Sequence, residues 1–495
     1  MENEQSSRVR TGYGLLFVAA TFVFLYLRTF VWPGTPQVAY GDETVFFGHG
    51  IRMLHGQVPF RDYFAFVMPG TDLFYAGAFG VLGVHAWVAQ AFVILLGGAI
   101  AGVLVWMSRK VLSGAAVFLP ALLFLTLDFD VNKDATHHWY STLLVLAASG
   151  VLLGGRSLRR ILGAGALCGL AAVFTQSEGL LGLIAIAVYL WWTGDGRQRL
   201  MELAALGLPF AVIVGGMLGY YVREAGFGAV YFGLVTFVFR YFPAFRAHRL
   251  GAYFMQVPPH HGLADVGRFV PYVFIHVLVP FAYLFCLWRL FREKAVMERR
   301  IWERLVLINF VGLALFAAIA SAASYHRMCM VAAPATIVCV WLAAGRGMRC
   351  LLWGVGLVTM VALPVQTQRH WRGILDLPTG RAAFLDRQEY EEFRWFAENT
   401  RAGEGFFNGP QITFVMGLEN PTALDHVTGV KFTRPEQVAG VIRALEDRRT
   451  PIVVMNTQGD EAGGVGDNLG PLREYLAKNY RVVKVFPGMQ IWERS

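Results

Sequence analysis

Two adjacent carboxylates, Asp42 and Glu43, are the side chains of this sequence best placed for acid–base chemistry. They follow an apolar run from Gly14 to Trp32, which has the length of a helix crossing the hydrocarbon core. The pair is therefore predicted at a membrane surface, where a carboxylate can take the proton of an attacking hydroxyl. The alternative is helix capping, because Asp before Thr44 is a natural N-cap and acidic residues favour a first turn.

The segment after the pair is predicted to be an amphipathic helix lying in the membrane interface. Its apolar positions fall mostly on one helical face, and three polar side chains supply the other. This helix would hold Asp42 near the outer surface, within reach of an acceptor in water. The apolar residues are Phe46, Phe47, Ile51 and Leu54, and the polar residues are His49, Arg52 and His55.

Membrane helices must position these residues. Of the 495 residues, 56% are hydrophobic and 16% are charged, whereas a soluble protein carries roughly 25% charged residues. Long apolar runs recur, so an α-helical polytopic membrane protein with about eleven spans is predicted. The expected spans are 13–32, 84–107, 112–127, 139–154, 161–174, 179–193, 203–222, 268–291, 303–322, 328–344 and 350–365, while 71–83 and 226–245 are ambiguous.

Basic residues indicate the orientation. Lys and Arg cluster in alternate short loops, for example at Arg109-Lys110 and from Arg289 to Arg304, and such loops are expected in the cytoplasm. The first loop, 32–83, and everything after about residue 366 then face outward. The net charge of +9 is explained by these loops, and no compact basic and aromatic patch indicates nucleic-acid binding. We expect a bacterial inner-membrane protein with its C-terminal domain outside the cytoplasm.

The C-terminal part differs in composition from the rest. We expect a transmembrane domain over 1–368 and a soluble α/β domain over 369–495, because helical and strand patterns alternate after Thr367. No phosphate-binding glycine motif follows a strand. The expected helices are Asp386–Asn399, Pro435–Asp447 and Leu472–Lys478, and the expected strands are Pro451–Met455, Tyr480–Phe486 and Met489–Trp492.

The first loop continues through Pro59–Phe64, which reads PFRDYF, to Met68-Pro69-Gly70. With the acidic pair after the first span, this pattern resembles the membrane-embedded glycosyltransferases of the GT-C fold. It is most similar to bacterial members grouped with protein O-mannosyltransferases and the aminoarabinose transferase acting on lipid A. The resemblance implies a polyprenyl-phosphate-linked sugar as donor, Asp42 as general base and Glu43 as its neighbouring acid.

The implied reaction is hexosyl or pentosyl transfer to an envelope glycan, lipid or protein on the outer face. A single base suffices for inversion, because a phosphate leaving group needs little protonation, whereas glycosidases need a second carboxyl for an alcohol leaving group. Arg61 and Asp62 are expected to contact substrate.

The second outer loop is also rich in polar side chains. Asp128 and Asp130 match the DxD form of a second acidic motif that GT-C enzymes often carry, and Lys133, His137 and His138 follow. These residues are expected to orient donor or acceptor. A divalent cation held by Asp128, Asp130 and His137 is an open alternative, because carboxylates with imidazole suit Mn²⁺ or Zn²⁺. A loop between two spans must be hydrophilic in any case.

The lipid phosphate should meet a cation, because charge-assisted hydrogen bonds stabilise developing negative charge. Arg327, preceded by His326, opens a late span and is the first choice, with Arg61, Lys133 and Arg240 as alternatives. An arginine that only reaches toward lipid headgroups is the competing interpretation.

Two other functions fit the hydropathy. A transporter or flippase of lipid-linked sugars would carry charges inside its spans and inverted repeats. A membrane-anchored assembly protein with its activity in the tail would make Asp42 dispensable. Beyond the open cation, no cofactor is expected, and the expected partners are the donor, the acceptor and membrane lipids.

Overall fold

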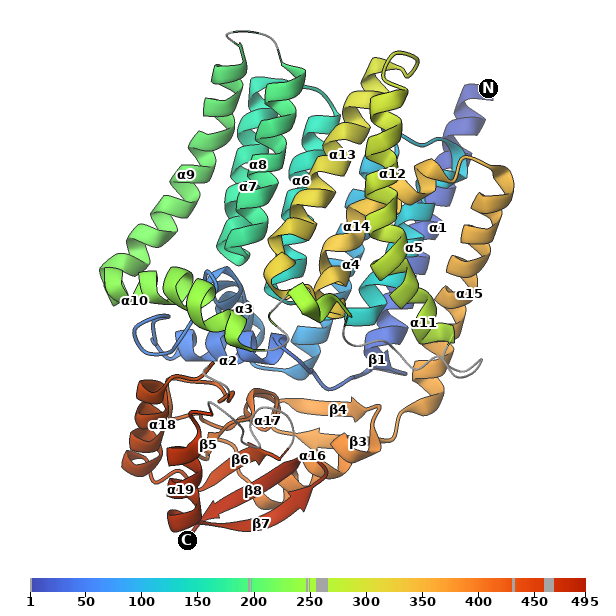
Figure 1. Cartoon of the computed structure of the whole chain (residues 1–495). Helices are drawn as coiled ribbons and strands as arrows, with labels where there is room; N and C mark the ends of the chain where they lie inside the picture. The colour runs from blue at the N-terminus through green and yellow to red at the C-terminus, as the bar shows by residue number, and fades with distance from the viewer. Residues whose placement is uncertain are drawn as a thin grey trace. The chain divides into compact units, whose positions relative to one another are not determined.

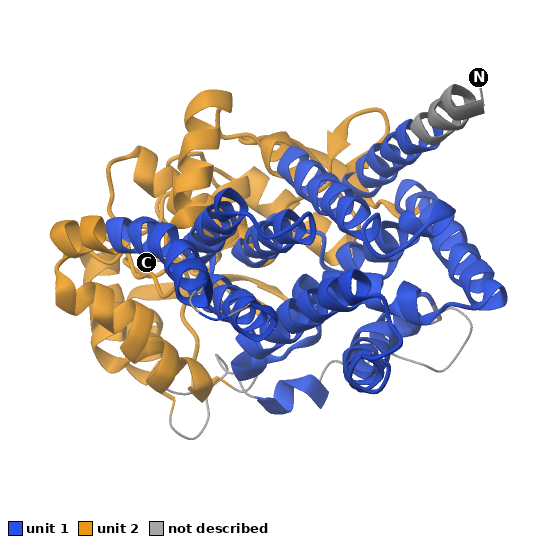
Figure 2. Cartoon of the chain, turned by 90° about the horizontal axis from the view of Figure 1, so that it is seen from above, with its two compact units in different colours: residues 1–29, 91–217, 249–369 blue, residues 30–90, 218–248, 370–495 orange. Residues whose placement is uncertain are grey.

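The computed structural model describes residues 2–194, 196, 198–245, 248, 250–254, 266–429, 432–457 and 467–495. The chain divides into two compact units, which Figure 2 shows in different colours. Unit 1 comprises Met1–Thr29, Ala91–Met217 and Arg249–Arg369. Unit 2 comprises Phe30–Gln90, Leu218–His248 and His370–Ser495.

Unit 1 is helical. Its helices, three of which have residues in unit 2, are α1 (Glu2–Thr29), α4 (Ala86–Ser108), α5 (Leu119–Leu123), α6 (His137–Leu153), α7 (Leu158–Phe174), α8 (Gln176–Thr193), α9 (Gln198–Ala225), α11 (Val266–Val273), α12 (Val279–Arg292), α13 (Arg299–Ala318), α14 (Tyr325–Leu342) and α15 (Arg346–His370). The shorter turns are η1 (Gly114–Val117), η2 (Phe124–Asp128), η3 (Phe129–Asn132), η6 (Leu250–Phe254), η8 (Phe274–Leu278) and η9 (Ala320–Ala322).

Within the described ranges, eight helical segments are long and apolar enough to cross a membrane. The segments expected to span at 112–127, 139–154, 161–174 and 179–193 are helical over shorter stretches or less apolar and are not among the eight, so the number eleven stays a prediction. The ambiguous region 226–245 supplies one of the eight. The segments are Gly12–Thr29, Ala86–Ser108, Gln198–Ala225, Phe227–Ala244, Gly267–Arg292, Arg299–Ala322, Tyr325–Leu342 and Arg346–His370.

Small residues let the helices of unit 1 approach closely. A Cβ added to Gly179 on α8 would lie 2.1 Å from the backbone nitrogen of Ala172 on α7. A Cβ on Gly165 of α7 would lie 2.0 Å from the carbonyl oxygen of Leu206 on α9. Such contacts are typical of membrane helices, whose association depends on close packing rather than on a hydrophobic gain between helices. The neighbouring helices α6, α7 and α8 are visible in Figure 1.

Unit 2 combines the first loop with the C-terminal part. Its helices are α2 (Glu43–Leu54), α3 (Gly70–Leu82), α10 (Phe227–Tyr231), α16 (Arg387–Asn399), α17 (Pro410–Val415), α18 (Pro435–Asp447) and α19 (Gly470–Asn479), with the π-helix η4 (Phe232–Tyr241) and the short 3-10 helix η5 (Phe242–Ala244). Its strands are β1 (Phe30–Val31), β2 (Thr35–Pro36), β3 (Gly373–Leu377), β4 (Gly380–Phe384), β5 (Phe406–Phe407), β6 (Ile452–Asn456), β7 (Tyr480–Phe486) and β8 (Met489–Arg494).

The main sheet has the strand order β5-β6-β8-β7, with β5 and β6 parallel and the other pairs antiparallel. Val453 at its centre is paired with Phe407 and Trp492. Val441 and Leu472 from α18 and α19 belong to the same buried cluster as Val453, so these helices cover one face of the sheet (Figure 1). The expected α/β domain is confirmed, and α16, α18, α19, β6, β7 and β8 form where the sequence predicts them. The hairpin β3–β4 and the short strand β5 were not predicted.

The first loop is hydrogen-bonded to the C-terminal part within unit 2. The backbone nitrogen of Val38 in this loop donates to the carbonyl oxygen of Ala383 at 3.0 Å, and that of Ala86, at the start of α4 just after the loop, donates to Thr379 at 2.9 Å. Phe47 of α2 packs on Phe414 of α17, with ring centroids 4.8 Å apart. Loop and tail are therefore parts of one compact body, while the expected division into 1–368 and 369–495 stays a prediction.

Candidate active site

The acidic pair stands at the start of α2. Gly41 takes a positive φ of 73° that suits glycine, and the backbone nitrogens of Thr44 and Val45 then donate to Gly41 and Asp42. The side chain of Asp42 makes no capping hydrogen bond and is exposed. Asp42 thus occupies the N-cap position without the side-chain hydrogen bond of a cap, and its exposed carboxylate can meet a second reactant.

The neighbouring acid has a different environment. Glu43 is 1% exposed, although it follows Asp42 directly and carries the same functional group. A buried carboxylate costs free energy unless it is compensated, so it is better suited to supporting a site than to meeting a mobile acceptor. The structure thus separates two residues that the sequence presents as a pair.

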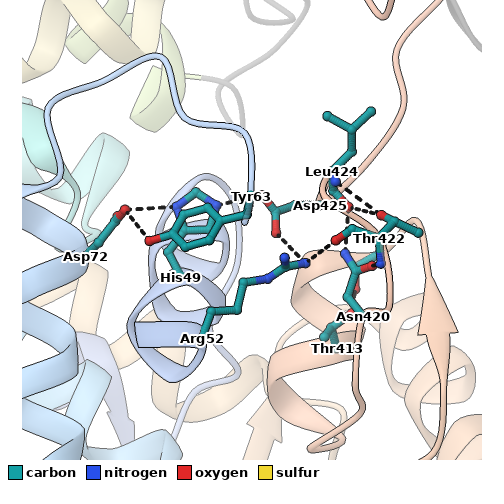
Figure 3. Close-up of polar contacts among 10 residues, drawn as sticks. His49, Arg52, Tyr63, Asp72, Thr413, Asn420, Thr422, Leu424 and Asp425 are labelled. Carbon is teal, nitrogen blue, oxygen red and sulfur yellow. Dashed lines mark hydrogen bonds and ion pairs between the residues drawn. The ribbon is translucent and has the colours of Figure 1, made fainter. Parts of the chain in front are cut away.

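Two of the three polar residues expected to face water, His49 and Arg52, are buried in the structure, whereas His55 after the end of α2 is exposed. Nε2 of His49 lies 2.7 Å from Oδ2 of Asp425, and Nδ1 lies 3.2 Å from Oδ2 of Asp72 on α3 (Figure 3). The hydroxyl of Tyr63 donates to the same Asp72 oxygen at 3.1 Å. Burial opposes protonation of His49, yet the two carboxylates raise its pKa to about 10. Although burial acts in the opposite direction, the positive charge of His49 lowers the pKa of Asp425 to about 2.

Arg52 extends this buried network by one turn. Its Nη2 donates to the carbonyl oxygen of Thr422 at 2.9 Å and lies 3.7 Å from Oδ1 of Asp425. Its guanidinium carbon is 5.5 Å from the ring centroid of Tyr63. The helix predicted for this segment is confirmed, and its cations bind groups of the C-terminal part.

Arg61 and Asp62 pair with each other. The Arg61 guanidinium donates to both oxygens of Asp62, at 3.0 and 2.7 Å. Asp62 also accepts the backbone N–H of Val58 at 2.7 Å, which closes the turn. The bonds from Arg61, together with the Val58 N–H, lower the pKa of Asp62, with burial opposing them. Both side chains remain partly exposed, so a substrate contact stays a prediction for them.

The loop near 128–138, which is expected to face outward, lies in unit 1. Asp128 ends the π-helical turn η2 and is fully buried. Asp130 accepts two hydrogen bonds from Arg28 of α1, at 2.5 and 2.9 Å. Arg28 also donates to the carbonyl oxygen of Leu363, at 3.1 Å, and to Thr367 on α15. Asp130 therefore ties η3 to two long helices, while Lys133 follows η3 and is half-buried.

The two histidines and Arg327 are brought together at helix starts in unit 1. His137 and His138 open α6 with ring centroids 4.0 Å apart, and Nδ1 of His137 is 2.8 Å from the Thr175 hydroxyl. His138 is hydrogen-bonded to Glu178, the buried acid at the start of α8. Arg327, half-buried in the first turn of α14, is close enough to His137 to act on it electrostatically. The preceding residue, His326, is exposed.

The proposed cation ligands do not form a metal site as they stand. Asp130 accepts hydrogen bonds from Arg28, and His137 is hydrogen-bonded to Thr175. In the part of the chain that the structure describes, no three His, Cys, Asp or Glu side chains are grouped as metal ligands. The cation held by Asp128, Asp130 and His137 therefore stays an untested expectation, and no step below depends on it.

Comparison with known proteins places the fold. No protein-family profile matches the sequence, and no curated protein matches it by sequence. ArnT from Cupriavidus metallidurans bound to undecaprenyl phosphate superimposes with a TM-score of 0.63 at 14% identity, covering 97% of this chain and 98% of ArnT. The archaeal oligosaccharyltransferase AglB from Archaeoglobus fulgidus, solved with an inhibitory peptide and a dolichol-phosphate, gives 0.53 at 12%, covering 90% and 70%. The chain has a GT-C fold.

The GT-C resemblance inferred from the first loop is thereby confirmed at the level of the fold, and so is the expected class of helical membrane protein with a C-terminal α/β domain. ArnT in the apo state matches in the same way, with a TM-score of 0.61 at 14% identity and 98% coverage of both chains. The roles of individual residues in this GT-C chain are taken up as proposals.

Proposed function

We propose that this protein transfers a sugar from a polyprenyl-phosphate donor to an acceptor hydroxyl at the outer face of the membrane. The observation that carries the proposal is the fold shared with ArnT over nearly the whole of both chains, because that structure holds undecaprenyl phosphate. AglB, with a dolichol-phosphate, supports the same donor class. The acceptor is an envelope glycan, a lipid or a protein, and the sugar is a hexose or a pentose.

Asp42 is proposed as the general base. Its exposed, uncapped carboxylate can meet an acceptor arriving from water. The acceptor oxygen attacks the anomeric carbon, its proton passes to the Asp42 carboxylate, and the bond from that carbon to the phosphate oxygen breaks. The electron pair of this bond leaves with the lipid phosphate, so one displacement inverts the anomeric configuration. Glu43, buried beside Asp42, supports the start of the helix.

Arg327 is proposed to bind the donor phosphate. Its planar guanidinium can give two parallel hydrogen bonds to phosphate oxygens and so stabilise the charge that grows on the leaving group. His137 and His138 lie at the neighbouring start of α6 and add polar groups to this region of unit 1. Lys133 and Arg61 are the alternatives if Arg327 only contacts lipid headgroups.

The orientation follows the distribution of basic residues. We propose that residues 32–83 and 370–495 face outward from a bacterial inner membrane, since Lys and Arg cluster in the loops of the other side. A reporter active only in the cytoplasm, fused after Ser495, is then expected to be silent. Activity of that reporter would contradict this topology.

The test of the function is a direct transfer assay. Purified protein in lipid vesicles is given polyprenyl-phosphate sugars and an extract of envelope glycans, lipids and proteins, and release of polyprenyl phosphate is measured with the new glycoside. A comparison of envelope glycans with and without the protein identifies the acceptor. We expect one sugar to be lost in its absence. The proposal would be contradicted if the envelope glycans were the same with and without the protein and the purified protein consumed no donor.

A further inference from the structure

The buried network around His49 joins parts of the chain that are distant in sequence. His49 contacts Asp425 across 376 positions, and on its other side it contacts Asp72 of α3. His49 and Asp72 are 5% and 2% exposed. Figure 3 shows the imidazole between the two carboxylates, with Arg52 directed to the same C-terminal loop. The network accounts for no step of the proposed transfer.

A buried network of charged side chains contributes little net stability to the position of a helix. Burying charges costs desolvation free energy, and the attraction between the charges often does no more than offset that cost. Apolar side chains of the same volume would hold two segments together equally well. Charge-assisted hydrogen bonds differ from apolar contacts in being directional. The imidazole of His49 on α2 is hydrogen-bonded through Nε2 to Asp425, and its Nδ1 is ion-paired with Asp72 on α3. The rotation of α2 about its own axis is thereby determined at this point.

His49 is placed to transmit that rotation to the acidic pair. Asp42 has helical backbone angles, and the seven residues to His49 correspond to about two turns, or roughly 10 Å along the axis. Asp42 and His49 therefore share one face of α2. A rotation fixed at His49 is carried by the backbone hydrogen bonds of the helix to Asp42.

The segment before Asp42 is held by the C-terminal part as well. Gln411 of α17 donates to the carbonyl oxygen of Ala39 at 2.8 Å and to Glu389 of α16 at 2.7 Å. Phe64, further along the first loop, donates its backbone N–H to Ala423 at 2.9 Å. The acidic pair is thus anchored from both sides by residues 370–495.

We propose that His49 is a positioning residue that, held between Asp425 and Asp72, sets the direction in which α2 presents the carboxylate of Asp42. The inference rests on the proposed function of Asp42 as general base. It gives the C-terminal segment a part in the reaction, since Asp425 controls the base while contributing no reacting group.

Because His49 is charged, its hold on α2 through Asp425 and Asp72 depends on pH. The groups facing it or its partners are Asp72, Asp425, Arg52, Tyr63, Tyr221 and His426. Loss of the imidazolium proton at alkaline pH leaves Asp72 and Asp425 without their shared cation. We expect kcat to fall on the alkaline side as pH rises toward 10, in the wild type and not in a His49→Gln variant.

The experiment compares His49→Gln, Asp425→Asn and the double variant in the full-length protein in lipid vesicles. Asp376→Asn is the matched control, because Asp376 is paired with Arg381 on the surface of the same unit and is 87% exposed. Each single variant is expected to lower kcat about 10- to 100-fold through misplacement of the base, with the KM for donor little changed. The double variant should recover part of the loss, because the two amides can hydrogen-bond without charge.

Hydrogen exchange of the backbone of 43–54 supplies a readout that does not need sugar transfer. Exchange should quicken in both single variants and not in Asp376→Asn. If the wild type transfers no sugar, the proposed function is wrong. The hydrogen-exchange result then still shows whether His49 and Asp425 hold α2 in position. The inference would be overturned if a folded single variant showed the hydrogen exchange of the wild type or the kcat of the wild type. It would also be overturned if the only change were a higher KM for the donor. If His49→Gln does not fold, Asp425→Asn decides alone, because it keeps the shape of the side chain.

Discussion

The first loop, 32–83, and the loop near 128–138 contain the same kinds of residue in different surroundings. In the first loop, Asp42 is exposed and makes no capping hydrogen bond, while the cations of α2 are buried against carboxylates. In the second loop, Asp128 is buried, and Asp130 is paired with Arg28 of α1. A carboxylate next to a membrane helix can therefore serve chemistry or hold helices together.

The difference between the loops lies in what the carboxylates contact. A carboxylate whose oxygens accept hydrogen bonds from an arginine is fixed in place, and those oxygens are already occupied by a partner within the protein. A carboxylate facing solvent at the end of a firmly held helix is open to a second reactant and keeps a defined direction. This comparison supports the proposal that Asp42 is the general base, whereas Asp130 is paired with Arg28 in the helical unit.

The largest effect is expected at Asp42. Asp42→Asn keeps the shape of the side chain and removes the base, so transfer should fall by about 10² to 10⁴. The melting temperature should stay near that of the wild type, because the exposed side chain makes no capping bond. Turnover measured with the polyprenyl-phosphate donor, beside Asp376→Asn as control, checks this. Near-normal turnover would mean that the first loop is structural as well.

Asp130 is expected to affect stability more than turnover. Asp130→Asn leaves Arg28 with one good acceptor fewer, which should lower the free energy of unfolding by about 1.5–3 kcal/mol. Turnover for each folded molecule should change little. Thermal unfolding in detergent, followed by activity corrected for the folded fraction, separates the two quantities. A stable variant that has lost turnover would assign Asp130 to the substrate site instead.

Arg327 tests whether unit 1 supplies the phosphate contact. Arg327→Ala should weaken donor use by about 10- to 100-fold, because hydrogen bonds to charged groups contribute roughly 1.5–3 kcal/mol. Arg327→Lys keeps the charge and loses the planar fork of donors, so it should fall between alanine and the wild type. The measurement is the transfer rate against donor concentration for all three proteins. Superimposable curves would leave Arg327 as a lipid anchor.

The smallest effect concerns pH and the stability of unit 2. Because the pKa of His49 is raised to about 10 from an ordinary value near 6.5, its stabilising contribution is complete below pH 6.5 and is lost as pH rises through 10. The pKa of Asp425 is lowered to about 2, so its contribution is present above pH 4 and is lost as pH falls through 2. Melting temperatures between pH 6 and 10 should fall by a few degrees in the wild type and less in His49→Gln. If the melting temperatures of the wild type and His49→Gln fell equally with pH, the protonation of His49 would not contribute to the stability of unit 2.

Local patterns predicted much of this molecule. Apolar runs located the long helices, and the helix from Glu43 to Leu54 follows from its periodicity. In the tail, α18 and β7 form over the predicted residues because alternating and helical hydrophobic patterns are strong there. The fold class followed from these elements together with the motif of the first loop.

The partners of charged residues could not be predicted from the sequence. Asp425 is 376 positions from His49, and Asp130 is 102 positions from Arg28, so no local spacing connects them. Asp42 and Glu43 are adjacent acids, yet one is exposed and the other buried, a difference that depends on tertiary packing. Asp72 was missed, although an acid just after Pro69-Gly70 in an otherwise apolar helix is a recognisable signal.

The most direct test of this account is the turnover of Asp42→Asn relative to Asp130→Asn, each corrected for the folded fraction and measured with the same polyprenyl-phosphate donor. The account predicts that Asp42→Asn retains its stability and loses at least about 100-fold in turnover, while Asp130→Asn loses stability and keeps its turnover. The reverse pattern, with chemistry lost at Asp130 and retained at Asp42, would contradict it.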